Sequence, residues 1–220
     1  METIVLSCDF APSPPIPEGQ RVPFGWKAAA VESASVNKAT LLGWPEGARL
    51  DAAEHAYLRI CLACDVREEK QVEVALAKSG KVLGVFDIRY GYVHQIFEIP
   101  IPLTGLFAIP REGLALRMVK GEKPLWFFCD PDSAELPQTF QPHLLLARGK
   151  EDRLAAFYRQ LGSLASIQPF GWLEGCVTDG LTQLERAFPD TGWRDVLEAH
   201  LKLYFPDGRR LIMEDHYGKV

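Results

Sequence analysis

The hydrophobic pattern of this chain changes period near Lys150, and that change limits the folds open to it. Upstream, apolar and polar residues alternate with a period of two, as in Gln71 to Leu76, which is typical of strands with one buried face. Downstream, apolar residues recur at steps of three and four, which is typical of amphipathic helices. The sequence therefore predicts an α+β chain with two units, residues 1–149 and residues 150–220.

The upstream unit is expected to be an antiparallel, jelly-roll-like β-sandwich, because its short β-rich runs are separated by turns and by no predicted helix. One of these turns is the hairpin loop at Lys78-Ser79-Gly80. The expected strands lie at Tyr57–Cys64, Gln71–Leu76, Lys81–Ile88, His94–Ile99, Leu114–Val119 and Leu125–Cys129. Within the last run, Trp126, Phe127 and Phe128 are expected to bury alternately.

Two segments ahead of these strands are less regular. Asp9 to Pro23 contains five prolines and is expected to form an extended arm that cannot pair as a central strand. The segment from Trp26 to Thr40 is compatible with a short helix through Lys27–Ala30 and equally with an edge strand at Val31–Val36. The sequence leaves both alternatives open.

The downstream unit is predicted to contain three helices. They cover residues from about Leu154 to Leu164, from Trp172 to Phe188, and from Trp193 to Tyr204. A tight loop joins the second to the third, so these two are expected to form an antiparallel hairpin. Gly175 and Gly180 each cost a helix about 1 kcal/mol relative to alanine, which indicates close packing of a neighbour or a ligand there. After the third helix, Arg209 to Tyr217 is expected to be a short strand or loop.

Charge and hydropathy exclude two classes of partner. The chain has 24 basic and 29 acidic residues, a net charge of -5, and no basic block, so nucleic acid is not an expected partner. Its apolar stretches are far shorter than the roughly 20 residues that cross a bilayer, so no membrane partner is expected. Met1 to Phe10 lacks the features of a secretory signal, and a cytoplasmic location is therefore predicted.

The five cysteines favour free thiols over a disulfide framework, because their number is odd and the chain is too large to need one. A reducing compartment is the simpler interpretation. Cys61 and Cys64 form a CxxC, but in a strand they point to opposite faces and cannot share one tetrahedral metal. No metal site is predicted, and no phosphate-binding or dinucleotide loop points to a cofactor.

A family resemblance appears in FGWLEGCVTDGLTQLERAFPDTGWRDVLEAHLKLYFPDG, residues 170–208. The likeness is carried by Trp172 with Gly175, by Gly180-Leu181, and by the Thr191-Gly192 turn after Asp190. The stretch resembles the opening helical hairpin of bacterial (α/α)6-barrel glycoside hydrolases, in particular the unsaturated glucuronyl and rhamnogalacturonyl hydrolase group. Other α/α-toroid proteins, including epimerases and lyases, share this pattern.

The resemblance implies a twelve-helix barrel, of which this chain would hold the first helices behind an N-terminal sandwich. It also implies that an aspartate acts as general acid in hydration of an unsaturated uronic ring. No residue of this chain is matched to that aspartate, so the chain alone is expected to be inactive. The helices would pack against missing C-terminal helices or in a homo-oligomer.

Five residues are candidates for a sugar site. Asp179 is the best single candidate for a catalytic carboxylate, with an exposed helical aspartate as the alternative. Glu174 is a candidate for substrate binding, but it lies about 140° around the helix from Asp179, so the two do not face one substrate. Trp172 is suited to stacking on a sugar ring or to core packing, and Tyr90 and Tyr92 to an aromatic platform or to sandwich filling.

Nucleophilic catalysis has less support in the sequence. The GxSxG elbow of serine hydrolases is absent. Cys176 falls on the apolar stripe of the second helix and is expected in the core.

The sequence supports two hypotheses about function. In the first, the chain is the N-terminal portion of a carbohydrate-active hydrolase that acts on unsaturated uronyl oligosaccharides. In the second, it is a non-catalytic carbohydrate-binding or protein-interaction module.

Overall fold

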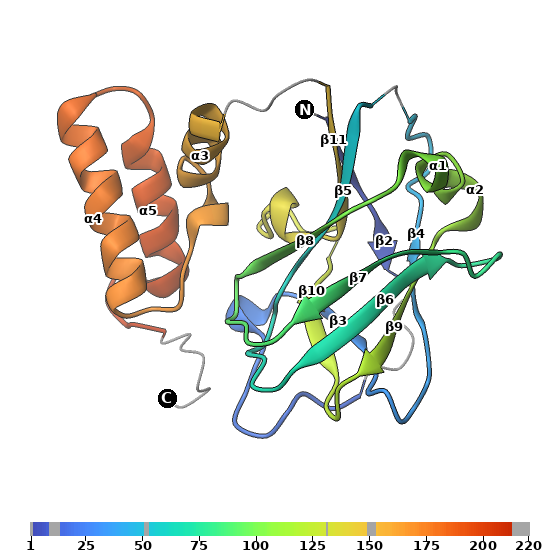
Figure 1. Ribbon diagram of the computed structural model, residues 1–220. Helices are drawn as coiled ribbons and strands as arrows, with labels where there is room; N and C mark the ends of the chain where they lie inside the picture. Colours follow the sequence, from blue (N-terminus) through green and yellow to red (C-terminus); the bar gives the residue numbers. More distant parts are fainter. Residues whose placement is uncertain (1, 9–13, 51–52, 131, 149–152, 213–220) are drawn as a thin grey trace.

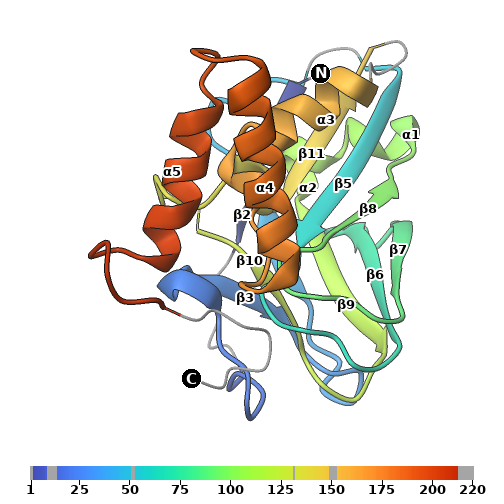
Figure 2. The same cartoon turned by 90° about the vertical axis from the view of Figure 1, so that its left-hand side faces the viewer.

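The computed structural model describes residues 2–8, 14–50, 53–130, 132–148 and 153–212 (Figure 1). Two antiparallel sheets pack face to face, and three helices lie together on one side of them (Figures 1 and 2). The unit boundary expected at 149/150, part of the arm at Asp9–Pro23 and the end of the segment Arg209–Tyr217 lie outside the described residues.

The described strands form two sheets and a separate ribbon. The first sheet has the order β1 (Glu2–Val5), β11 (His143–Ala147), β5 (His55–Cys61) and β8 (Ile96–Pro100). The second has the order β2 (Ser7–Cys8), β4 (Thr40–Gly43), β9 (Leu114–Lys120), β6 (Lys70–Leu76) and β7 (Val82–Ile88). The ribbon pairs β3 (Ala28–Val31) with β10 (Leu125–Phe128).

Strand pairing in this sandwich is nested. The first strand of the chain pairs with the last, β3 pairs with β10, β4 with β9, β5 with β8, and β6 with β7, all antiparallel. The innermost pair is joined by the turn before Lys81, where Gly80 has φ 70°. The β-rich part of the chain therefore follows the path of one long hairpin that has been rolled up.

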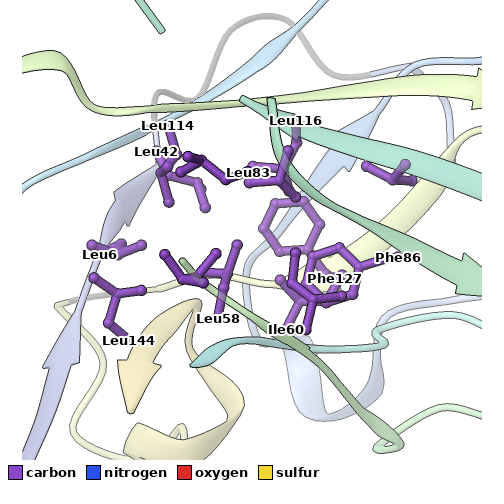
Figure 3. Packing of buried hydrophobic residues seen from close by; sticks show 14 of the residues in the cluster. Leu6, Leu42, Leu58, Ile60, Leu83, Phe86, Leu114, Leu116, Phe127 and Leu144 are labelled. Atoms are coloured by element: carbon purple, nitrogen blue, oxygen red, sulfur yellow. The ribbon is translucent and has the colours of Figure 1, made fainter. Parts of the chain in front are cut away.

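The main core lies between the two sheets (Figure 3). It is built by alternation: in β6, Val72 and Val74 are buried while Gln71 and Glu73 are half-buried. Figure 3 shows residues of the first sheet and residues of the second approaching each other across this core. They include Leu58, Ile60 and Leu144 on one side and Leu42, Leu114 and Leu116 on the other.

A second core joins the ribbon to the helices. Trp126, Phe127 and Phe128 were expected to bury alternately, but all three are buried. Phe127 packs in the main core, whereas Trp126 and Phe128 pack in this second cluster, because both faces of β10 are covered. The helical side contributes Ile167 and Tyr204. The helices are thus anchored to the sandwich through a patch of aromatic and aliphatic contacts.

The helical part begins with α3 (Arg153–Leu161), followed by a 3-10 turn, η3 (Leu164–Ser166). The long helices α4 (Trp172–Ala187) and α5 (Trp193–Tyr204) lie side by side as the expected hairpin (Figures 1 and 2). The remaining elements are η1 (Pro23–Gly25), η2 (Gln138–Phe140), α1 (Leu103–Leu106) and α2 (Ile109–Glu112).

Several expectations from the sequence are corrected here. Helices α1 and α2 do lie between strands β8 and β9, where no helix was expected; proline precedes the first and occupies the start of the second. Between Trp26 and Thr40 the chain forms strand β3 at Ala28–Val31 and a turn at residues 34–36, so neither the helix at Lys27–Ala30 nor the edge strand at Val31–Val36 is present. Gly175 and Gly180 are not sites of close packing, because a Cβ added at either would meet nothing within 4 Å.

The cysteines also differ from the expectation of free thiols. Cys8 and Cys129 are joined by a disulfide that ties β2 to the end of β10. Cys61 and Cys64 are free and buried, as expected for small core thiols, and burial raises the pKa of Cys64 to about 12. Cys176 is exposed and not in the core, because the inward side of α4 is centred on Glu174 and Leu181 and Cys176 lies outside it.

Candidate binding pocket

A pocket of about 520 Å³ lies between the first sheet and the helices. Strands β5 and β8 supply Arg59 and Glu98, and the loop that leads into β8 supplies Tyr92, Val93, His94 and Gln95. The opposite wall comes from the helical part through Gln160, Gln168 and Leu173. Polar side chains thus face one another across a cavity whose remaining lining is aromatic and aliphatic.

Arg59 and Glu98 form an ion pair at the sheet wall of the pocket. They occupy directly opposite positions on β5 and β8, so their side chains emerge on the same face of the sheet. Nε of Arg59 donates a hydrogen bond to Oε2 of Glu98 over 2.5 Å. Both side chains are partly exposed, so the pair contributes little to stability but presents charged donors and acceptors to the cavity.

His94, in the loop that leads into β8, is a buried, neutral histidine. Its ring stacks on Phe128 and Phe140, with ring centroids 5.6 Å away in each case, and Trp26 meets it edge-on. Burial, with a smaller contribution from nearby His200, lowers the pKa of His94 to about 3. Neither ring nitrogen of His94 has a hydrogen-bond partner among the described residues.

Gln168 is held in place at the helical wall by buried side chains. Its backbone N–H donates to Oε2 of Glu174 over 2.8 Å, and its carbonyl accepts a hydrogen bond from the hydroxyl of Tyr204. These two bonds fix the backbone of Gln168 beside the pocket. Its side-chain Nε2 donates to the carbonyl oxygen of Ser166 over 3.5 Å, a long hydrogen bond that a ligand can replace.

Behind Gln168, Glu174, His200 and Ser166 form a buried hydrogen-bonded chain. Nδ1 of His200 lies 2.7 Å from Oε1 of Glu174, and Nε2 lies 3.2 Å from Oγ of Ser166. This order of groups matches a serine nucleophile, its base and an orienting carboxylate. However, Ser166 is only 7% exposed, and its hydroxyl is within hydrogen-bond distance of the carbonyls of Leu161 and Ser163. The chain of groups therefore ties η3, α4 and α5 together and does not present a nucleophile.

Of the residues singled out from the sequence, only Tyr92 lines the pocket. Tyr90 lies two residues away and is 68% exposed, and the guanidinium of Arg67 covers one face of the Tyr92 ring at 5.2 Å. Trp172 is 78% exposed next to the lining residue Leu173.

The two acidic candidates on α4 face different surroundings. Asp179 is exposed to solvent. Glu174 is 2% exposed and supports Gln168 from within the helical part, out of reach of a ligand in the pocket. The structure does not bring Glu174 and Asp179 to a common site.

Sequence reasoning missed the ion pair that marks the sheet wall. A signal was present: Arg59 and Glu98 are single charges inside otherwise apolar runs, Tyr57–Cys61 and Ile96–Pro100. A charge in such a run is costly unless it has a partner, and the partner here is the other charge. No comparable signal marks Gln160 or Gln168.

Two further features bear on ligand class. In the part of the chain that the structure describes, no group of three or more histidine, cysteine, aspartate or glutamate side chains is placed to hold a metal ion. Within the same residues, no helix has both the length and the apolar character required to cross a membrane.

Comparison of the chain with protein-family models, with curated proteins and with solved structures gives no significant match. The likeness of residues 170–208 to (α/α)6-barrel hydrolases therefore remains a prediction from the sequence. The case for function depends on the pocket.

Proposed function

We propose that this chain binds carbohydrate in the pocket between the first sheet and the helices. The observation that carries the proposal is the lining of the pocket. Arg59 and Glu98 offer charged donors and acceptors, and the amides of Gln160 and Gln168 offer both kinds of group from the opposite wall. Sugar hydroxyls need donors and acceptors together, and the less polar face of a sugar ring needs an aromatic or aliphatic contact, which Tyr92 provides.

The path of the chain supports the same proposal. The nested pairing of β1 with β11, β4 with β9, β5 with β8 and β6 with β7 is the connectivity expected of a jelly roll. Jelly rolls occur in lectin domains, although they also occur in proteins that bind no sugar. This support is an analogy at the level of the fold, and the pocket carries the functional argument.

We further propose that the chain forms the sandwich and first helices of a carbohydrate-active hydrolase. This part depends on the resemblance of residues 170–208 to the opening of an α/α barrel. Most glycoside hydrolases use two carboxyl groups, one on each side of the scissile bond. Among the described residues that line the pocket, Glu98 alone carries a carboxylate. The proposal therefore assigns binding to this pocket and places catalysis elsewhere in the assembled enzyme.

Isothermal titration calorimetry with a panel of neutral and acidic oligosaccharides tests the binding proposal. At least one ligand is expected to bind, and Gln168→Ala is expected to weaken that binding about fivefold to tenfold through the lost hydrogen bond. Gln183→Ala is the matched control, because Gln183 is an exposed glutamine on α4 that does not line the pocket. Failure of every oligosaccharide to bind would refute the proposal.

The hydrolase proposal needs a separate measurement. The chain by itself is expected to show no turnover on unsaturated uronyl oligosaccharides or on their saturated counterparts. The full product of its gene is expected to hydrolyse at least one of them. Absence of turnover by that product on all of them would count against the hydrolase group while leaving the binding proposal intact.

A second candidate function, a protein-interaction module, is favoured by the outer surface of the helices. Large apolar side chains are exposed there, including Leu154, Phe157, Trp172 and Phe188. Under the hydrolase proposal, further helices of the barrel would cover this surface. Under the alternative, a second copy or another protein would cover it, and light scattering of the purified chain would then show a stable oligomer.

A further inference from the structure

The charges that line the pocket cancel. Arg59 contributes a positive charge and Glu98 a negative one, and the two are joined directly. His94 adds no charge near neutral pH, because burial lowers its pKa to about 3. The other lining residues carry amide, phenol or aliphatic side chains. The guanidinium of Arg67, which covers the Tyr92 ring, is balanced by Asp65, with which it forms an ion pair over 2.6 Å.

The residue directly opposite Arg59 on the neighbouring strand adds no charge to the ion pair either. His143 of β11 lies directly opposite Arg59 on the neighbouring strand, so the two side chains share a face of the sheet. Burial lowers the pKa of His143, and its Nδ1 lies 2.7 Å from the carbonyl oxygen of Gln141. The imidazole beside Arg59 is thus neutral near pH 7.

A ligand carboxylate would meet an unfavourable environment in this pocket. To pair with Arg59 it would have either to displace Glu98 or to bind the other guanidinium N–H groups beside it, and both arrangements bring two carboxylates close together. A neutral sugar causes no such repulsion. Its hydroxyls can donate to Glu98 and accept from the guanidinium and amide N–H groups while the ion pair stays intact.

We propose that the pocket selects a neutral, hydroxyl-rich saccharide over the corresponding uronate. This inference rests on the proposed carbohydrate site and narrows its ligand class. It also departs from the uronyl substrates that the family resemblance implies. The ion pair between Arg59 and Glu98 is the element that sets the selectivity.

The decisive variant is Glu98→Gln, which keeps the size and hydrogen-bonding capacity of the side chain but removes its charge. Arg59 then has no carboxylate partner on β8, and the pocket gains a net positive charge. Asp87→Asn is the matched control. It removes the same charge from the exposed pair of Asp87 with Arg89 on the second sheet, away from the pocket. Circular dichroism of both variants checks that they are folded.

The test is calorimetric titration with pairs of oligosaccharides of one linkage that differ only in a hydroxymethyl group or a carboxylate at C6. The wild-type chain is expected to bind the neutral member at least about tenfold more tightly. Glu98→Gln is expected to raise affinity for the uronate about tenfold, and this gain should shrink with added salt. Asp87→Asn should leave both affinities unchanged.

Three outcomes would overturn the inference, and they are distinguishable from one another. If the wild-type chain binds the uronate as tightly as its neutral partner, the selectivity is refuted while carbohydrate binding stands. If neither member of any pair binds, the proposed function fails as well. A Glu98→Gln variant that binds neutral sugars normally and gains no affinity for uronates would show that the ion pair does not set the selectivity.

Discussion

Nδ1 of His200 lies 2.7 Å from Oε1 of Glu174, and both side chains are sealed from solvent where α4 meets α5. The inward side of α4 combines this polar contact with part of the apolar stripe. Its buried residues are Glu174 and Leu181, and Val177 and Leu184 of the stripe are half-buried, whereas Leu173 and Cys176 are exposed. The pair therefore lies on the side of the helix that packs against α5.

Replacing His200 with alanine is expected to lower the free energy of unfolding by about 3 to 5 kcal/mol, because the buried Glu174 would then keep only the backbone N–H of Gln168 as a partner. Urea denaturation followed by circular dichroism measures the change. Arg194→Ala is the control, because it breaks an exposed ion pair with Glu198 and should cost no more than about 0.5 kcal/mol. A loss below about 1 kcal/mol for His200→Ala would argue against a structural role for the pair.

The protein is expected to become less stable as the pH falls, because of His94. Its pKa is lowered from 6.5 to about 3 in the folded state, mainly by burial. Between these values the unfolded chain binds a proton that the folded chain does not, so the contribution is complete above pH 6.5 and is lost as pH falls toward 3. The slope from this one group approaches about 1.4 kcal/mol per pH unit.

Urea unfolding between about pH 7 and about pH 4.5 measures this slope. His94→Asn is the comparison, since asparagine tolerates the left-handed backbone of position 94, where φ is 69°. The variant is expected to show a shallower dependence on pH than the wild type. Equal slopes would mean that His94 does not titrate as its surroundings indicate.

Gly175→Ala and Gly180→Ala are each expected to stabilise the protein by about 0.5 to 1 kcal/mol. Both glycines lie inside α4, and a Cβ at either would meet open space, so the alanine gains helix propensity at no steric cost. Thermal unfolding measures the gain. Gly91→Ala should act in the opposite direction, because its Cβ would lie 2.4 Å from Cδ1 of Leu62. Destabilisation by the α4 substitutions would show that something packs there after all.

The cysteines are expected to fall into three classes of reactivity. Cys176 should react with a thiol reagent in the folded protein, whereas Cys61 and Cys64 should react only after unfolding, because they are buried with raised pKa values. Mass spectrometry counts the labels.

Cys8 and Cys129 should react only after reduction of their disulfide. Because that bond closes a loop with a sequence separation of 121, its reduction should lower stability by roughly 4 kcal/mol, measured as a shift of the urea midpoint. Cys176→Ser should shift neither the midpoint nor its response to reductant. Labelling of Cys8 without reductant would contradict the pairing.

The strands with one solvent-facing side were predictable from the sequence, and so were the three helices after residue 152, whereas the short helices α1 and α2 were missed. Residues 70–76 alternate because one side of β6 faces the core, and residues 172–187 repeat at helical steps. Strand β11 was missed because all five of its residues are buried, which removes the alternation that marks a strand. Strands β1 and β4, each four residues long, were missed as well.

The pocket was much less predictable. Tyr92 was singled out for its aromatic ring, but Arg59 and Glu98 become a pair only when β5 and β8 align. Glu174 was interpreted as a ligand-binding residue, yet its surroundings are set by His200, which is 26 residues away in the sequence. The role of a polar residue depends on the residue that it contacts in the folded protein, and the neighbouring sequence does not indicate which residue that is.

The sequence by itself determined which segments form strands and which form the long helices, because backbone preference and side-chain periodicity act over a few residues. Only the tertiary structure decided the nested pairing that joins β1 to β11, the inward face of α4, and the ion pair between Arg59 and Glu98. These features join residues that are tens of positions or more apart. Such contacts form when the whole core closes, and their stability is a property of the assembled packing rather than of any one segment.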